Sequence, residues 1–182
     1  ERILAGGRRF KYPLQYVRHR LVFNTIIISV VAVIVLVSVG YWQLYSVQNT
    51  NVFFYNVTKV VPLPVGSVDG QPVLYSDYLI RYRSAIYNLE QKEQVSLKTE
   101  DGKRQADYHK QKAMQAAIND AYGAKVASKL GLSVTDAELE SYIKAQRQTA
   151  DGEISQQTYD AATLDILGWS PDEYRHVLKN EL

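Results

Sequence analysis

The stretch LVFNTIIISVVAVIVLVSV, residues 21–39, decides the architecture of this chain of 182 residues. It holds no charged side chain, and the uncharged run continues as far as Lys59. At about 1.5 Å rise per residue, such a stretch forms a helix of roughly 28 Å, close to the hydrocarbon thickness of a bilayer. β-Branched residues dominate it, but a backbone in lipid must satisfy its own hydrogen bonds, which favours helix over strand. We therefore predict a transmembrane helix over residues 21–42, with Leu21 to Val39 in the membrane.

The flanks of this stretch predict its orientation. Residues 1–20 carry six Lys or Arg and one acidic residue, which predicts a basic cytoplasmic flank and an extracytoplasmic body. Tyr41, Trp42 and Tyr45 follow the apolar run, as in an interfacial aromatic belt. A cleavable signal peptide is the alternative, but the run is long and Gly40-Tyr41-Trp42 is a poor cleavage context. A buried pair of strands would need a turn that the stretch does not contain.

Charge and composition exclude several classes of function. Residues 21–182 hold more Asp and Glu than Lys and Arg, so the body would repel the phosphates of a nucleic acid. The chain has no cysteine, which excludes disulfides, thiolate metal sites and a cysteine nucleophile. Its three histidines are scattered, and no glycine-rich phosphate loop is present. We predict no metal, no cofactor and no catalytic residue within these residues.

Residues 43–66 are expected to form a stalk. Val52–Val61 is rich in β-branched and aromatic residues and predicts a strand, and Pro62 and Pro64 then require extended backbone. Asn56-Val57-Thr58 matches the glycosylation sequon, a triplet that arises often by chance.

Residues 67–182 predict one small, mainly helical domain with a short β element. Asp69-Gly70 is a turn signal between apolar residues, and Ser76 is expected to cap a helix that ends near Glu90. After a polar connection, an alanine-rich helix should run from Gln105 to Leu130 and end at Gly131. Three shorter helices should follow: one begins at the capping box Thr135–Glu138, one covers Gln156–Leu167, and one begins at the capping box Ser170–Glu173.

Three stretches carry a resemblance to a known family: VPLPVGSVDGQPVLYSDYLIRY (61–82), KVASKLGLSVTDAELESYI (125–143) and LGWSPDEYRHVLKNEL (167–182). Together they resemble the N-terminal domain of SurA-like and PpiD/PrsA-like foldases, and the preceding apolar stretch resembles the anchor of the membrane-bound members. The second stretch is the most specific. The resemblance implies a mainly α fold and a role as a chaperone or foldase.

The chain departs from the family's enzymes in one respect. They carry a parvulin domain after this helical region, and nothing in these residues resembles one, so the resemblance assigns peptidyl-prolyl isomerase activity to no residue here. The sequence also lacks an initiator Met. We expect it to be part of a longer or processed chain.

Our leading hypothesis is a membrane-tethered extracytoplasmic chaperone module that binds unfolded or newly secreted polypeptides in an apolar cleft. Fourteen tyrosines suit such a surface, because each ring offers apolar area with a polar tip. The candidates for lining the cleft are Tyr78, Tyr82, Tyr142, Ile143 and Tyr174. Each of them also fits a structural role in the core.

The alternative hypothesis is a bitopic structural or assembly subunit of a membrane or secretion complex such as the translocation machinery. Asn24, Ser29 and Ser38 would then provide polar contacts between membrane helices. An enzymatic reading rests on the acidic cluster Asp136, Glu138 and Glu140, but acidic residues in a first helical turn are accounted for by the helix dipole. His109 and His176 have no adjacent Ser or Cys nucleophile.

Overall fold

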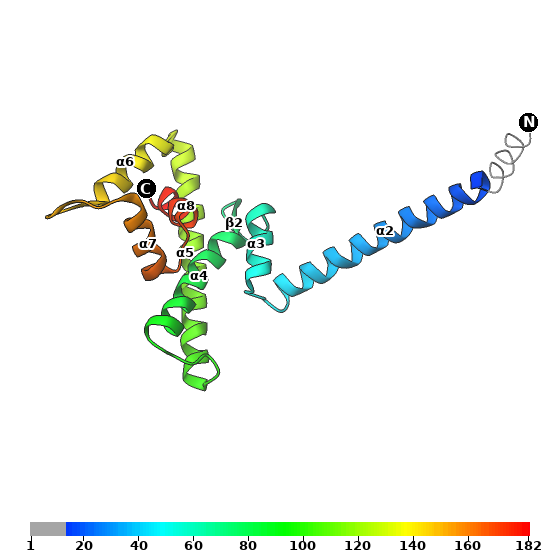
Figure 1. Cartoon of the computed structure of the whole chain (residues 1–182), viewed down its shortest axis with the longest axis horizontal. Helices are drawn as coiled ribbons and strands as arrows, with labels where there is room; N and C mark the ends of the chain where they lie inside the picture. The colour runs from blue at the N-terminus through cyan, green and yellow to red at the C-terminus, as the bar shows by residue number, and fades with distance from the viewer. Residues whose placement is uncertain (1–13) are drawn as a thin grey trace, which may run out of the picture. The chain divides into compact units, whose positions relative to one another are not determined.

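The computed structural model describes residues 14–182, which form two units, one up to Asn49 and one from Thr50 to Leu182 (Figure 1). Four of the six basic residues of the predicted flank lie outside the described residues. The fold is mainly α-helical with small strands, as predicted.

The first unit contains a single long helix, α2, Leu14–Tyr45. Its segment from Arg20 to Tyr45 is long and apolar enough to cross a membrane, as predicted. The hydroxyl groups of Thr25 and Ser38 donate hydrogen bonds of 2.8 Å to the carbonyls of Leu21 and Ile34, four residues earlier. These two polar groups are therefore satisfied within the helix, which a membrane-spanning segment would require.

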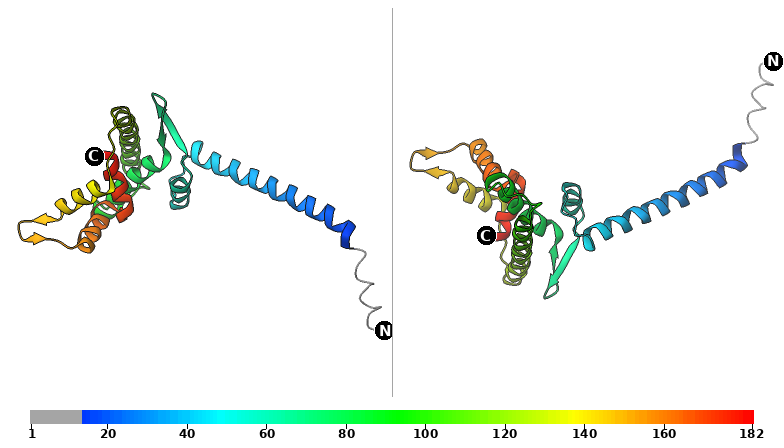
Figure 2. Two further views of the ribbon diagram at one scale, coloured as in Figure 1. Left: turned by 90° about the horizontal axis from the view of Figure 1, so that it is seen from above. Right: turned by 90° about the horizontal axis from the view of Figure 1, so that it is seen from below.

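The second unit is a set of helices with two small hairpins (Figure 2). Its elements in chain order are α3 (Val52–Val60), β1 (Pro64–Val68), β2 (Gln71–Leu74), α4 (Tyr75–Tyr87), the π-helical turn η1 (Asn88–Lys92), α5 (Glu100–Leu130), α6 (Asp136–Gln146), β3 (Gln148–Thr149), β4 (Gly152–Glu153), α7 (Gln156–Leu167) and α8 (Pro171–Glu181).

The predicted strand over Val52–Val61 is wrong, because Val52–Val60 forms helix α3. The Asn51 side chain caps this helix by accepting a hydrogen bond of 3.0 Å from the Phe53 amide. Tyr55 and Thr58, three residues apart, are both buried against the body. The cap and this tertiary packing together outweigh the β-propensity of the valines and phenylalanines.

The hairpin β1–β2 turns at Asp69-Gly70, as the turn signal predicted, and both residues have positive φ. The prediction that Ser76 caps the next helix is wrong. Strand β2 runs directly into α4, so the capping position falls on Leu74, whose side chain makes no capping bond. Helix α4 then ends at Tyr87 and continues as η1, close to the expected end at Glu90.

Helix α5 begins at Glu100, five residues before the predicted start, because Thr99 caps it by accepting a hydrogen bond from the Gly102 amide at 3.1 Å. Its packing face is formed by alanines: Ala113, Ala117 and Ala121 are buried. The bulky row at Tyr122, Val126 and Leu130 is exposed instead. Small side chains thus allow α5 to approach α4, the helix with which it makes its most extensive contact.

The remaining helix boundaries confirm the local signals in the sequence. Gly131 ends α5 in the left-handed conformation, with φ of 69°. Both predicted capping boxes are present, Thr135 with Glu138 and Ser170 with Glu173, and Pro171 opens α8. Between α6 and α7, the hairpin β3–β4 turns at Ala150-Asp151.

The core around α4 contains several tyrosines. Tyr75 and Tyr78 are buried, and the Tyr78 ring meets Tyr75 edge-on and stacks on Tyr82. Arg81 on the same helix holds Asp120 of α5 through two hydrogen bonds of 2.7 and 3.0 Å to one carboxylate oxygen. Because both charged groups are largely enclosed, this pair fixes how α4 and α5 align.

We expect Tyr78→Phe to raise the free energy of unfolding by about 1 kcal/mol. The Tyr78 hydroxyl is buried and has no hydrogen-bond partner among the described residues, so its removal relieves a desolvation cost. Tyr174→Phe is the matched control: its hydroxyl lies 2.6 Å from that of Tyr159, and its loss should lower stability by about 1 kcal/mol. Urea unfolding in detergent measures both, and equal destabilisation would contradict the assignment.

Candidate functional site

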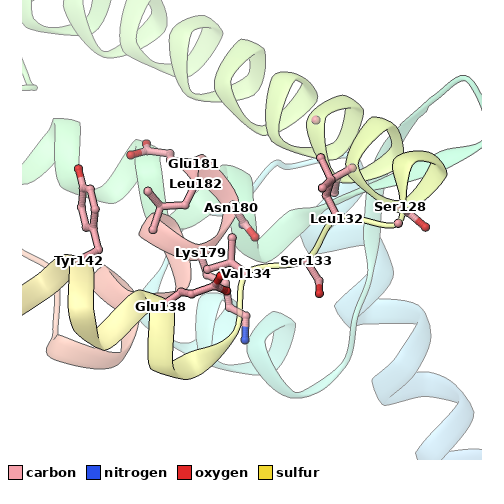
Figure 3. A pocket seen from close by; sticks show the side chains of 14 residues that line it. Ser128, Leu132, Ser133, Val134, Glu138, Tyr142, Lys179, Asn180, Glu181 and Leu182 are labelled. Atoms are coloured by element: carbon pink, nitrogen blue, oxygen red, sulfur yellow. The ribbon is translucent and has the colours of Figure 1, made fainter.

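The second unit contains a groove of about 1030 Å³ between the end of α5, the start of α6 and the end of α8 (Figure 3). Its volume is at the upper end of those of small-molecule sites, enough for several side chains of a peptide. It is lined by Gly123, Ala124, Ala127, Ser128, Gly131, Leu132, Ser133, Val134, Glu138, Tyr142, Lys179, Asn180, Glu181 and Leu182.

Helix α5 forms one wall with small residues. Gly123, Ala124 and Ala127 leave the helix backbone accessible to a ligand, and Ala124 continues the buried alanine row of Ala117 and Ala121. The alanine face is covered by other helices in its middle and opens to the groove in its last turns. A wall of this kind allows close approach of another main chain.

The end of α5 is fixed by its glycine cap. The Leu132 amide donates a hydrogen bond of 2.9 Å to the Ala127 carbonyl, so the chain turns sharply out of the helix at Gly131. The turn leaves the Leu132 side chain 63% exposed. Val134 follows and packs against the cluster of Leu139, Ile143 and Leu178 that underlies α6 and α8.

The charged residues that line the groove are all engaged in other contacts. Glu138 accepts hydrogen bonds of 2.8 Å from both the amide and the hydroxyl of Thr135, which lowers the pKa of its carboxyl group. Lys179 donates to Asp136 at 2.7 Å, and Glu181 accepts from Arg81 at 3.0 Å. The groove therefore presents small and apolar side chains with neutral polar groups, such as Asn180, and no uncompensated charge.

Of the residues predicted to line a cleft, Tyr142 alone lies in this groove, on α6, where its side chain stands at one end of the hollow (Figure 3). Ile143 is 1% exposed and belongs to the core cluster below. Tyr174 packs against that cluster and is held by Tyr159.

Tyr78 and Tyr82 lie elsewhere, on α4, and do not line the groove. Tyr78 is buried in the core and Tyr82 is half-buried beside it. Burial raises the pKa of both phenols, in agreement with a packing environment. The structure thus distributes the five predicted residues over three places.

The profile of the SurA-like N-terminal domain family matches residues 14–182, which is nearly the whole chain. The chain belongs to this family. No curated protein and no solved structure gives a significant match to it. The match extends over α2 as well as over the second unit, so the long apolar helix is included in the family pattern.

Sequence reasoning missed most of the groove of this SurA-like domain. Leu132, Leu182 and the alanines of α5 were not among the candidates. Only Leu132 left a signal that could have been used: a large apolar residue directly after a capping glycine, where the chain leaves the helix and a side chain is readily exposed. The alanines of the groove give no such signal, because other alanines earlier in the same helix, Ala117 and Ala121, are buried in the core.

The acidic cluster in the SurA-like domain is structural. Asp136 pairs with Lys179, Glu138 completes the capping box, and Glu140 accepts from Arg175 at 2.9 Å. Within residues 14–182 that the structure describes, no group of three His, Cys, Asp or Glu side chains is placed to hold a metal ion.

His176 is the residue through which we expect the stability of the SurA-like domain to depend modestly on pH. Its Nε2 lies 2.7 Å from the Asp77 carboxylate, which raises the pKa of the imidazole; Asp120 also raises this pKa, whereas burial and Lys59 oppose the shift. A raised pKa stabilises the fold below the unfolded value of about 6.5, and this stabilisation is lost as pH rises through the folded pKa.

We therefore expect the stability difference between the wild type and His176→Gln to be larger near pH ~5.5 than near pH ~8, by less than about 1 kcal/mol because the side chain is half exposed. Urea unfolding at both pH values measures it. A difference that grows with pH would contradict the Asp77 contact.

Proposed function

We propose that this chain is a membrane-tethered extracytoplasmic chaperone module of the PpiD/PrsA type, and that its α5–α6–α8 groove binds unfolded or newly secreted polypeptides. In this proposal α2 spans the membrane with the N-terminus in the cytoplasm. The observation that carries it is the groove itself: an open hollow with a small-residue wall, an exposed leucine at its edge and all its charges engaged elsewhere. Family membership supports the chaperone context.

The chemistry of the groove suits unfolded polypeptide. Apolar side chains of a client would replace water against Leu132, Val134 and Leu182, at roughly 25 cal/mol for each Å² of apolar surface removed from water. The small residues of α5 let an irregular backbone come close, and neutral donors and acceptors such as Ser128 and Asn180 can bond to peptide groups. Because no charge selects the ligand, such a site favours broad and weak binding over one specific partner.

The polar residues of α2 support the assembly-subunit alternative less well than the groove supports the chaperone proposal. The Ser38 hydroxyl, one of the groups expected to contact other helices, already donates to its own helix at Ile34. A translocation complex remains a proposed neighbour of a chaperone in this location. The proposal assigns binding to these residues and assigns no catalysis.

The full chain in lipid nanodiscs tests this function. A chemically unfolded client diluted into buffer should scatter less light as the chain is added, with empty nanodiscs as the control. Suppression should reach its limit near equal molar amounts of chain and client, since one groove holds one segment. If the chain leaves client aggregation unchanged and instead copurifies with a single stoichiometric partner, the chaperone proposal fails and the assembly role replaces it.

A further inference from the structure

Helix α3 presents an apolar face that no described residue of the body covers. Val52 is 51% exposed, Phe53 66% and Val60 83%, and Val61 directly after the helix is also exposed. At 100° per residue, Val52, Phe53, Asn56 and Val60 fall on one side of the helix. Three of these four positions are apolar, and the face carries no acidic residue.

The opposite face of α3 is fixed to the body, so the apolar side cannot turn inward. Tyr55 is buried, its hydroxyl donates a hydrogen bond of 2.6 Å to the Glu173 carboxylate, and the Arg83 guanidinium lies over its ring. Thr58 is also buried and donates to the Tyr55 carbonyl. A short helix held in this way on one side keeps its other side directed away from the body.

The chain itself ties this face to the neighbourhood of α2. Six residues, 46–51, separate the end of α2 at Tyr45 from Val52. Fully extended, that connection reaches at most about 25 Å, so α3 must stay within this distance of the end of the apolar helix. No charged residue occurs between Arg20 and Lys59, which means that the connection and α3 up to Lys59 carry no charge.

From these observations we infer that α3 is an interfacial helix whose outer face, Val52, Phe53, Asn56 and Val60, lies in the headgroup region of the lipid bilayer. The inference rests on the membrane anchoring of α2 that is part of the proposed function. A lipid surface suits this face because α3 is amphipathic and already held next to the bilayer, where apolar rings and valines bury readily.

Lys59 and Asn56 complete the pattern expected at an interface. The Lys59 side chain is 44% exposed at the edge of the face, within 3.5 Å of Glu173, and a long cationic side chain can keep its ammonium group at headgroup level. Asn56 is exposed and can hydrogen-bond to headgroups or to water. Tyr55 joins α3 to α8 through Glu173. Contact of α3 with lipid would therefore hold the helical domain against the membrane surface, in addition to the tether that α2 provides.

Single-cysteine labelling tests the inference cleanly, because the chain has no cysteine of its own. Nitroxide labels at Phe53→Cys and Val60→Cys would be compared with labels at Tyr108→Cys on α5 and Leu164→Cys on α7, which are exposed by 55% and 52%. The full chain is placed in vesicles of neutral phosphatidylcholine. Accessibility to oxygen, which enters lipid, and to a water-soluble nickel chelate is then measured by electron paramagnetic resonance.

We expect the ratio of oxygen to nickel accessibility at positions 53 and 60 to exceed that at 108 and 164 several-fold. Nickel accessibility at 53 and 60 equal to that of the two controls would overturn the inference, since the face would lie in water. Exclusion of both reagents would also overturn it, because a protein partner or a second copy would cover the face. A label at Val31→Cys separates the two proposals: lipid contact there without lipid contact at 53 and 60 defeats the interfacial helix alone.

Discussion

Ile143→Ala is expected to lower the free energy of unfolding of the helical domain by about 3 kcal/mol. Ile143 is 1% exposed and forms the core cluster with Leu139 and Leu178, where α6 packs on α8. Removal of its side chain would leave a cavity that the surrounding core residues fill only in part. The loss is large against the total stability of a small domain, so partial unfolding at physiological temperature is a further expected result. Urea unfolding monitored by circular dichroism measures it.

The adjacent residue supplies the control. Tyr142 lies on the same helix but lines the groove and is 38% exposed, so Tyr142→Ala should cost less than about 1 kcal/mol and should weaken client binding instead. The two neighbours were both candidates for the binding surface, and this pair of variants separates the packing residue from the groove residue. Equal loss of stability in the two variants would contradict the burial difference on which the groove assignment depends.

Leu132→Asp is expected to reduce the affinity for an unfolded client at least tenfold, equivalent to about 1.4 kcal/mol. The substitution removes an exposed apolar contact at the edge of the groove and adds a carboxylate. A client that binds through apolar side chains would have to desolvate this charge without a partner, because Lys179, the nearby cation that lines the groove, is already held by Asp136. Fluorescence anisotropy of a labelled unfolded client measures the change.

Leu164→Asp is the matched control, with the same substitution on α7 at a leucine that is 52% exposed and does not line the groove. Its client affinity should equal that of the wild type. Both variants alter exposed positions, so both should fold, which circular dichroism checks. If the two variants lose affinity equally, binding depends on general surface hydrophobicity and the groove has no special role.

The sequence predicted the helical framework well where the determining interactions are local. The two capping boxes, Gly131 and the turn at Asp69-Gly70 each act within four residues of the chain, and all of them are present. The long apolar helix was also predictable, because the length and composition of the uncharged stretch are sufficient for a helix that spans a bilayer. Signals of this kind need no knowledge of the rest of the fold.

Helix α3 could not be predicted from propensity, because its stability depends on distant residues. Its Tyr55 hydrogen-bonds to Glu173, which lies 118 residues further along the chain. The capping signal at Asn51 was present in the sequence, but the valines and phenylalanines that follow it favour a strand when they are read alone. Tertiary contact decided between the two structures.

The sequence predicts that an apolar cleft exists, but it does not predict which residues line this cleft. Amphipathic helices make an apolar cleft expected, but its position depends on where helix α5 extends beyond the helices that cover its alanine face. Ala121 is buried and Ala124 is exposed, although the sequence around the two is similar. The tyrosines were favoured as candidates because each ring combines apolar area with a polar tip, and of these Tyr142 alone lies in the groove.

Site-specific photocross-linking is the direct test of whether the α5–α6–α8 groove binds unfolded polypeptide. A photoreactive amino acid would replace Leu132 in the groove or Leu164 on α7 in the full chain in nanodiscs, and a radiolabelled unfolded client would be added before irradiation. We expect strong cross-links from position 132 that an excess of unlabelled client removes, and only background from position 164. Equal cross-linking from the two positions, or none from position 132 while aggregation is still suppressed, would contradict binding in the groove.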